Sequence, residues 1–241
     1  MLRRWEDLPA KMQIDEVRPY YDVLKKKRLS LFCKRVFDIV VSLFMLIILS
    51  PVFLILAVAI KLDSKGPVFY RQTRITQYGK EFRIFKFRTM VQNADKIGAQ
   101  VTVNNDSRIT RVGKLIRRCR LDEICQLIDV LRGTMTFVGA RPEVIKYVDR
   151  YTPEMLATFL LPAGVTSESS IYYKDEDRLL DGADDVDGVY VSKVLPGKMY
   201  YNLKAIKNFG FWKDIKIMFM TVFAVLGKEY VGDYVSSENE K

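Results

Sequence analysis

The sequence contains no histidine among its 241 residues. This absence excludes a Ser-His-Asp triad, a zinc site with histidine ligands and acid-base catalysis by imidazole. Any catalysis must therefore use carboxylates, Lys, Arg, Tyr, Ser or Cys. The three cysteines, Cys33, Cys119 and Cys125, form no Cys-x-x-Cys pair. They are expected to be packed free thiols in a protein of the reducing cytosolic face.

Two common nucleotide-binding signatures are also absent. Neither G-x-G-x-x-G nor G-x-x-x-x-G-K-[ST] occurs, so dinucleotide binding and P-loop binding have no support. Two Asp-x-Asp patterns do occur, at 175–177 and 185–187. Such pairs can hold the divalent ion of a nucleotide-sugar glycosyltransferase. Both lie in an acidic stretch without a preceding strand pattern, which predicts a solvated loop.

Positive charge is in excess. The sequence has 39 Lys and Arg against 29 Asp and Glu, a net charge of +10. A positive field favours anionic partners, which are nucleic acid, anionic lipid or phosphorylated substrates. Residues 1–30 are predicted to form a short helix and a linker that ends in a basic cluster. This cluster either binds anionic headgroups of a membrane or is a solvated charge run.

One hydrophobic run, residues 36–60, is long enough to enter a bilayer. As a straight helix it would reach ~37 Å, against a hydrocarbon core of ~30 Å. Basic residues flank both ends, whereas a single crossing should show that bias on one side. Pro51 predicts a kink, and Ser50 can bond a carbonyl that the kink frees. A re-entrant hairpin and a kinked transmembrane helix both stay open.

The rest of the chain predicts a mixed fold. Alternating and aromatic residues predict a β-hairpin over 68–90 with its turn at 77–80. Apolar spacing predicts helices. The segment 153–161 is expected to lie at the membrane interface, and 199–226 to supply one or two amphipathic helices that pack the core or rest on the lipid. The predicted elements are helices at 110–120, 121–133, 153–161 and 199–226, and a strand at 134–138. The fold class is therefore α+β, mainly helical and membrane-associated, with a kinked membrane helix, a small hairpin or sheet and interfacial amphipathic helices.

Asp122 and Glu123 lie in the first turn of the helix predicted at 121–133, which is expected to end at Gly133. Carboxylates at this position are favoured by the helix dipole by up to ~1 kcal/mol, so capping alone can explain them. Three arginines just upstream, Arg117, Arg118 and Arg120, favour a functional interpretation.

Further cations are candidates for binding phosphate. The predicted hairpin carries Arg71, Arg74, Lys86 and Arg88, which either grip a diphosphate or form a solvated face. Arg141 precedes Pro142, which favours an extended backbone and a rigidly held guanidinium.

These segments together resemble the bacterial sugar transferase family, also called monotopic phosphoglycosyl transferases or polyprenol-phosphate sugar-1-phosphate transferases. The motifs follow the order of that family. They are Lys34–Asp38, Ser50-Pro51, Gly66–Phe69, Tyr78–Lys80, Lys86–Met90, Arg108–Gly113, Leu121–Glu123, Gln126–Ile128 and Phe137–Pro142.

The resemblance implies a re-entrant helix over 31–62 that breaks at Ser50 and Pro51. Residues 1–30 would then be an N-terminal basic segment, and residues 63–241 a catalytic domain on the cytosolic face of a bacterial inner membrane. Membrane lipid is an expected partner and nucleic acid is not. The number of copies in the assembly stays open.

The resemblance also implies a two-step reaction. Asp122 would attack the β-phosphate of a UDP-sugar, release UMP and carry the sugar phosphate. Polyprenol phosphate, such as undecaprenyl phosphate, would then accept it. Mg²⁺ is the implied cofactor, with Glu123 as its ligand. Phosphate contacts are expected from Arg88, Arg141 and, with less support, Lys86.

Several positions depart from the family pattern. Ala140 replaces the first proline of Pro-Arg-Pro, Cys125 a frequent proline and Asp129 a frequent Asn. The segment 162–167 lacks the arginine that the family often has there, so that phosphate contact is not carried over. Two other functions remain open. One is a non-catalytic membrane scaffold that binds anionic lipid or a partner protein, and the other is an Asp-x-Asp glycosyltransferase that releases UDP.

Overall fold

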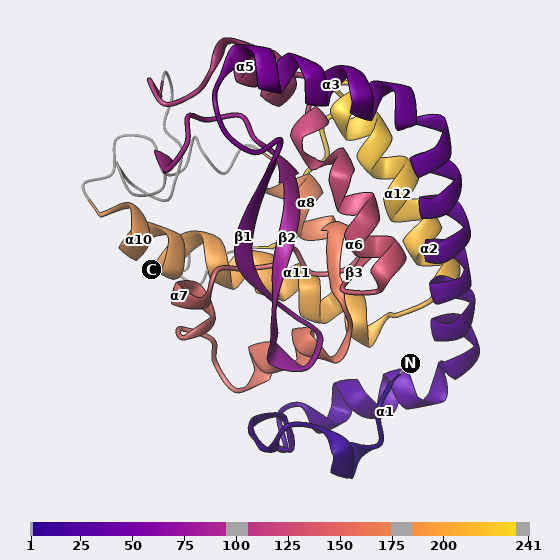
Figure 1. Cartoon of the computed structure of the whole chain (residues 1–241). Coiled ribbons are helices and arrows are strands. Elements are labelled where there is room, and N and C mark those ends of the chain that lie inside the picture. Colours follow the sequence, from indigo (N-terminus) through magenta and orange to yellow (C-terminus); the bar gives the residue numbers. More distant parts are fainter. Residues whose placement is uncertain (1, 95–105, 175–184, 235–241) are drawn as a thin grey trace.

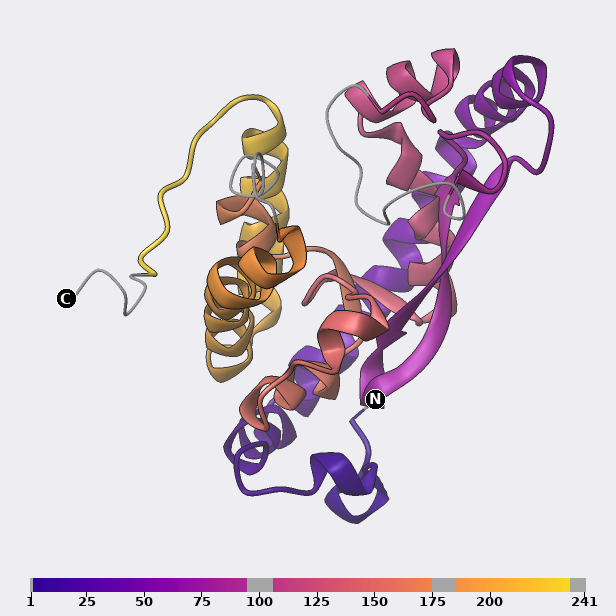
Figure 2. The same ribbon diagram turned by 90° about the vertical axis from the view of Figure 1, so that its left-hand side faces the viewer.

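The computed structural model describes residues 2–94, 106–174 and 185–234 (Figure 1). Within these ranges the chain is mainly helical and contains two small sheets of two strands each. The predicted mainly helical α+β class is confirmed to that extent. In Figure 2, helices α11 (Leu195–Lys207) and α12 (Phe211–Val225) lie on the side of the molecule away from the hairpin of β1 and β2.

The hydrophobic run forms two helices, α2 (Arg28–Ile48) and α3 (Ser50–Asp63), and the second is bent by 60° from the direction of the first. Pro51 lies in the first turn of α3, where its missing N–H removes no helical hydrogen bond. Ser50 Oγ donates to Ile47 O at 2.7 Å. The predicted break at Ser50 and Pro51 is confirmed. Among the described helices, none alone combines the length and the apolar composition needed to cross a bilayer, but this bent pair does so when taken together.

Helix α2 buries Lys34, Asp38 and Ser42 and exposes most of its apolar side chains. Lys34 Nζ donates to Val138 O at 2.7 Å and pairs with Asp214 Oδ2 at 2.6 Å. Asp38 accepts hydrogen bonds from Thr136 and from the backbone of Phe137. Several apolar side chains of the two helices are at least 48% exposed; they include Val40, Leu43, Phe44, Ile47, Leu54, Ile55 and Val58.

The predicted hairpin is confirmed. Strands β1 (Phe69–Thr76) and β2 (Lys80–Phe87) pair antiparallel along their full length. The turn η3 (Gln77–Gly79) places Tyr78 and Gly79 at φ of 61° and 68°. Tyr78 tolerates this left-handed conformation because its hydroxyl and ring are held from outside the turn. The hydroxyl accepts from the backbone N–H of Arg3 at 3.0 Å, and the guanidinium of Arg3 lies 4.6 Å from the ring centre.

The N-terminal residues belong to the hydrophobic core. They form η1 (Trp5–Asp7), η2 (Ala10–Met12) and α1 (Arg18–Lys26). The short helix expected within residues 1–30 is therefore present. The remainder is not a loose linker, because Leu8, Met12 and Val17 are buried against the turn of the hairpin and η5 (Glu154–Leu160).

The helix predicted over 121–133 begins differently from the prediction. Residues Leu121–Gln126 form the 3₁₀ helix η4, and only Leu127–Arg132 form the α-helix α6. Arg120 has a φ of 55°, so the chain turns sharply out of α5 (Arg111–Arg118) and enters the next helix through a tighter winding. Gly133 ends α6 at a φ of 82°, which confirms the predicted cap.

The second sheet holds the loop that carries Arg141. Strand β3 (Met135–Val138), predicted at 134–138, pairs parallel with β4 (Ala163–Thr166). A Cβ on Gly164 would lie 2.2 Å from Gly139 N, so the two chains come this close because glycine has no side chain.

The remaining helices lie beyond the loop after β3 in the sequence, and α12 packs on both strands of this sheet. They are α7 (Ile145–Val148), α8 (Glu168–Tyr172), α10 (Val186–Val189) and the π-helical η6 (Tyr190–Val194), followed by α11 and α12. The segment predicted at 199–226 is thus two helices. The interfacial prediction for 153–161 is wrong, because Ala157 and Leu160 are fully buried in the core. Helix α12 instead exposes a row of apolar residues, Trp212, Phe219, Val222 and Phe223.

Candidate active site

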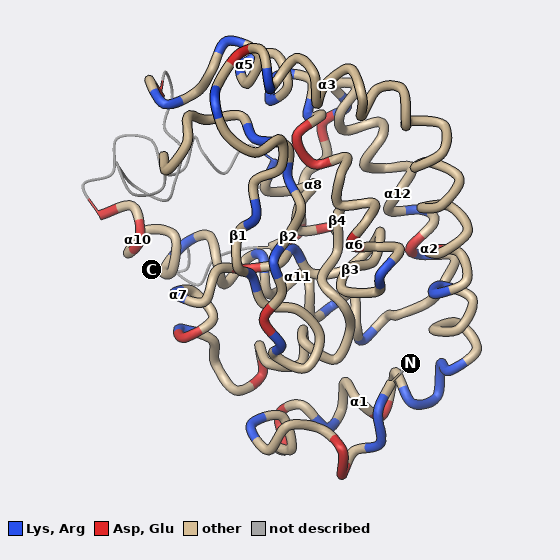
Figure 3. The backbone as a smooth tube through the Cα atoms, in the orientation of Figure 1, with Lys and Arg blue, Asp and Glu red and all other residues tan. Residues whose placement is uncertain are grey.

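Helix α5 approaches the end of β2 closely enough to bring its last turn beside Asp122. The Thr110 side chain caps α5 by accepting from Gly113 N at 3.0 Å. A Cβ on Gly113 would lie 2.0 Å from Thr89 O, so only glycine allows this approach. The acidic residues of η4 lie next to this contact, at the end of α6 nearest to α3 and α5 (Figure 3).

Glu123 is held by two cations. Its Oε1 accepts from Lys86 Nζ at 2.9 Å and from Arg141 Nη2 at 2.5 Å, and its Oε2 accepts from Arg141 Nη1 at 3.3 Å. Burial by itself would raise the pKa of Glu123, but Arg141 and Lys86 outweigh it and hold that pKa well below its usual range. Three residues predicted to share a site, Glu123, Lys86 and Arg141, therefore meet in the structure.

Asp122 has the opposite environment. Burial chiefly, and then the negative charge of Glu123, raise the pKa of its carboxyl group, while Lys86 and Arg117 oppose that rise. A carboxylate with a raised pKa is more basic than an ordinary aspartate and a stronger nucleophile toward phosphorus. Two adjacent carboxylates with pKa values shifted apart are suited to different roles in one reaction.

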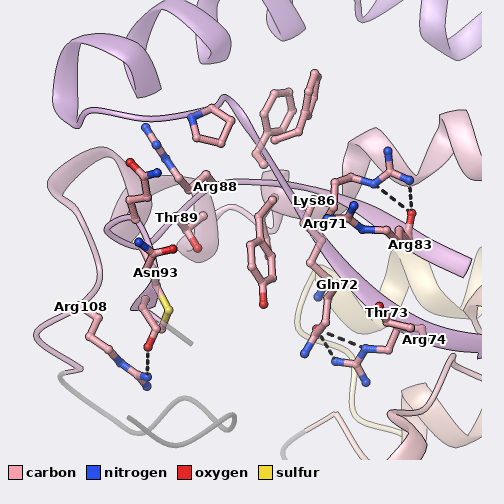
Figure 4. A pocket seen from close by; sticks show the side chains of 18 of the residues that line it. Arg71, Gln72, Thr73, Arg74, Arg83, Lys86, Arg88, Thr89, Asn93 and Arg108 are labelled. Atoms are coloured by element: carbon pink, nitrogen blue, oxygen red, sulfur yellow. Dashed lines mark hydrogen bonds between the residues drawn. The ribbon is translucent and has the colours of Figure 1, made fainter. Parts of the chain in front are cut away.

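Asp122 lies in the wall of a groove of about 930 Å³. Among the described residues that line it, Asp122 is the single acidic one, whereas the basic ones are Arg71, Arg74, Arg83, Lys86, Arg88, Arg108, Arg117 and Lys146. Figure 4 shows several of these side chains along the strands and on the facing loop. A cleft with this charge and size fits an elongated ligand that carries several negative charges.

Arg88 is bound mainly to the end of α3. Its Nη1 donates to Lys65 O and its Nη2 to Ser64 O, both at 2.7 Å. Gly66 leaves room for this contact, because a Cβ there would lie 2.0 Å from Nη1. Arg88 is 5% exposed, and its Nε has no hydrogen-bond partner in the described part of the chain. A contact from Arg88 to phosphate stays a prediction.

Arg117 is a functional candidate to which the sequence assigned no individual role. Its Nε donates to Thr89 Oγ1 at 2.8 Å, and its side chain lines the groove together with Asp122. Helical spacing provides a signal for it, because Arg117 follows Gly113 by four residues and lies on the same face of α5. Arg118 and Arg120, from the same cluster, do not line the groove.

The carboxylates fit one type of magnesium site. In residues 2–94, 106–174 and 185–234, no three His, Cys, Asp or Glu side chains gather closely enough to hold an ion by themselves. Mg²⁺ usually binds through one or two carboxylates, with substrate phosphates and water completing its shell. Glu123 fits this arrangement, because its Oε2 has one long contact whereas its Oε1 has two short ones.

The Asp-x-Asp patterns lie apart from these carboxylates. Residues 175–177 are outside the described residues. The loop predicted at 185–187 is instead the start of α10, where Asp185 Oδ1 accepts from Gly188 N at 2.9 Å. The Asp187 carboxylate is engaged by Lys146 and by the Tyr147 hydroxyl.

Comparison with known proteins gives consistent matches. Residues 29–228 match the family described as bacterial sugar transferase. A UDP-N-acetylgalactosamine-undecaprenyl-phosphate N-acetylgalactosaminephosphotransferase of Aeromonas hydrophila is 33% identical over 225 residues, which are 92% of this chain and 50% of that protein.

Two glucose-1-phosphate transferases are similar to the same degree. A UDP-glucose:undecaprenyl-phosphate glucose-1-phosphate transferase of Escherichia coli K12 is 35% identical over 86% of this chain and 43% of its own length. A protein of the same name from Caulobacter vibrioides is 34% identical over 80% of this chain and 69% of its own length. The chain thus spans half or less of the first two relatives and about two thirds of the third.

Proposed function

The chain belongs to the bacterial sugar transferase family, and we propose that it transfers a sugar 1-phosphate from a UDP-sugar to undecaprenyl phosphate or another polyprenol phosphate. The names of the three relatives combine these two substrate types. One observation carries the proposal: Asp122, with a raised pKa, lies in the wall of a cationic groove large enough for a nucleotide sugar.

In the first step, a carboxylate oxygen of Asp122 attacks the β-phosphorus, which bears the sugar. The bond from this phosphorus to the bridging oxygen breaks, and UMP leaves with the electron pair. The product is an aspartyl phosphosugar. Arg141, Lys86 and Arg117 are close enough to the carboxylate pair to offset the repulsion between the anionic nucleophile and the anionic diphosphate.

In the second step, a phosphate oxygen of the polyprenol phosphate attacks the same phosphorus. The bond to Asp122 breaks, the free carboxylate is restored and the lipid diphosphosugar is formed. Glu123 keeps Lys86 and Arg141 in place through both steps. When bound, Mg²⁺ would neutralise phosphate charge, with Glu123 as its protein ligand.

The reaction is proposed to take place at the cytosolic face of a bacterial inner membrane, as the first membrane step in the synthesis of a surface glycan or glycoconjugate. The bent pair α2 and α3 exposes apolar side chains, and so does α12. Such a surface favours insertion into lipid. A site beside it is within reach of both a soluble nucleotide sugar and a lipid phosphate.

The experiment uses the full chain in detergent or nanodiscs with Mg²⁺, sugar-labelled UDP-sugars and polyprenol phosphate. The proposal expects UMP release, a labelled protein adduct before acceptor is added, and loss of both in Asp122→Asn. Full turnover by Asp122→Asn would refute the nucleophile. Release of UDP would identify a glycosyltransferase instead, and lipid binding without any turnover would identify a scaffold.

A further inference from the structure

A second, much smaller pocket of about 30 Å³ lies beside the groove. Arg74 and Lys86 line both cavities, so the pocket adjoins the groove. Its other lining residues are Ile84, Gln126, Arg141 and Pro142. Side chains from the hairpin, from η4 and from the loop after β3 therefore converge on a space that holds only a few atoms.

Gln126 is the first sign that the space is built for a ligand. The residue is 2% exposed, and its side-chain amide makes no hydrogen bond to the part of the chain that the structure describes. Its amide atoms keep some accessible surface, because among the described residues Arg88 Nε is the fully enclosed side-chain atom without a partner. Because Gln126 lines the pocket, a bound group there can accept a hydrogen bond from this amide.

Arg74 is the second sign. Its guanidinium donates to Gln72 Oε1 at 2.7 and 3.2 Å, drawn in Figure 4, and to Pro142 O at 3.3 Å. These acceptors are neutral, and in the described residues no carboxylate lies within ion-pair distance of Arg74. Burial lowers its pKa, which the charge of Glu143 partly offsets. A buried cation with neutral ligands is stabilised when an anion joins it.

The lining of the pocket is cationic. Among its described lining residues, Arg74, Lys86 and Arg141 are basic and none is acidic. Glu123 binds Lys86 and Arg141 from outside this lining, and the charge of Glu143 acts on Arg74. Three cations that converge on a space without a carboxylate in its lining favour an oxyanion such as a phosphoryl group. The small volume admits the oxygens of one phosphoryl group and excludes a nucleoside or a sugar.

We propose that this pocket binds a single phosphoryl group of a substrate, with Arg74 and Gln126 as binding residues in addition to Lys86 and Arg141. The inference rests on the proposed function. The phosphoryl group comes either from the diphosphate of the nucleotide sugar or from the monophosphate of the acceptor lipid. Both present the same oxyanion, and the two half-reactions distinguish them.

The test compares wild type with Gln126→Leu and Gln126→Glu, each as the full chain in nanodiscs. Gln126→Leu removes the amide from a buried position and leaves an apolar side chain, so folding should be unharmed. Gln126→Glu keeps the size of the side chain and adds a negative charge. The change in Tm on adding inorganic phosphate measures phosphate binding and does not require turnover. Phosphate should bind about tenfold more weakly to Gln126→Leu, and more weakly still to Gln126→Glu.

The two half-reactions then identify the source. If the nucleotide sugar supplies the group, Gln126→Leu forms the labelled adduct about tenfold less efficiently when no acceptor is present. If the lipid supplies it, adduct formation is unchanged and its transfer to polyprenol phosphate falls by that factor. Unchanged phosphate binding and unchanged half-reactions would overturn the inference. Weakened phosphate binding without any adduct in wild type would retain the pocket and refute the proposed reaction.

Discussion

Arg141 binds Glu123 with both ends of its guanidinium, through contacts of 2.5 Å to Oε1 and 3.3 Å to Oε2. Only a planar fork makes this contact, and a lysine ammonium does not. This ion pair joins the loop after β3, which carries Arg141, to η4, which carries Glu123. It therefore fixes the position of Glu123, next to Asp122, relative to the groove. The departure from Pro-Arg-Pro at Ala140 has not prevented Arg141 from reaching Glu123.

Replacing Arg141 by lysine should therefore reduce activity while charge is kept. We expect kcat/KM for the UDP-sugar to fall about 10- to 100-fold, since hydrogen bonds to charged groups contribute about 1.5–3 kcal/mol. UMP release measures this. Arg150→Lys, at an exposed position on the same segment, is the matched control and should keep the wild-type rate. Equal activity in both variants would exclude a need for the fork.

Asp122→Asn should abolish turnover and yet stabilise the fold at neutral pH. The raised pKa of Asp122 means that the folded state disfavours the charged carboxylate. The stability that the protonated Asp122 carboxyl group contributes is fully present below its ordinary pKa of 3.8. It is lost as the pH rises through the pKa of Asp122 in the folded state. Asparagine removes this penalty, and each 1 kcal/mol gained corresponds to roughly 2–4 °C in Tm for a chain of this size.

Thermal unfolding of wild type and Asp122→Asn between pH 4 and 8 checks the direction of this pH dependence. The Tm advantage of Asp122→Asn should be largest at pH 7 and should shrink as the pH falls toward 4. A variant that is less stable than wild type at pH 7 would contradict the inferred environment of Asp122.

Local signals in the sequence predicted the parts of the fold that depend on backbone chemistry. Pro51 marks the helix break, Gly79 the hairpin turn and Gly133 the helix end, because each restricts or frees φ in its own residue. The acidic pair and its partners Lys86 and Arg141 were also identified, through charge and through the family resemblance.

Features that depend on tertiary packing were missed. The apolar spacing of 153–161 is the same for a helix in a core and for one on a lipid surface, so the pattern cannot identify which apolar environment receives it. The tight winding of η4 follows from the left-handed conformation of Arg120, which nothing local required. The charge of Arg88 was evident, but its carbonyl partners on Ser64 and Lys65 depend on how α3 ends.

If the bent pair α2 and α3 is re-entrant, as the basic flanks and the family resemblance imply, both of its ends lie on one side of the membrane. Reporters Lys27→Cys and Lys65→Cys, each in a chain without other cysteines, should react with an impermeant thiol reagent only from the cytosolic side. The native Cys119 caps the C-terminal end of α5 and is exposed, so the expectation of a packed thiol is wrong there. When it is the single cysteine, it marks the side of the catalytic residues. Labelling of Lys65→Cys from the periplasm would establish a crossing.

Gly113→Ala tests whether the close approach of α5 to Thr89 positions Arg117. In an open helix this substitution would stabilise by about 1 kcal/mol, because alanine is the better helix former. Here the new Cβ would lie 2.0 Å from Thr89 O, so α5 must move away. Overpacking of this kind costs roughly 1–3 kcal/mol, and Tm should fall by several degrees. Because Arg117 moves with the helix, KM for the UDP-sugar should rise.

Gly210→Ala provides the control, since a Cβ there meets nothing within 4 Å. Its KM should stay at the wild-type value, and its Tm should fall less than that of Gly113→Ala, because the change affects only the N-cap of α12. The two measurements on Gly113→Ala separate stability from positioning. A lower Tm with an unchanged KM would show that Arg117 does not depend on the contact with Thr89. A higher Tm would show that α5 accommodates the methyl group, and that the approach seen at Gly113 is not required for the fold.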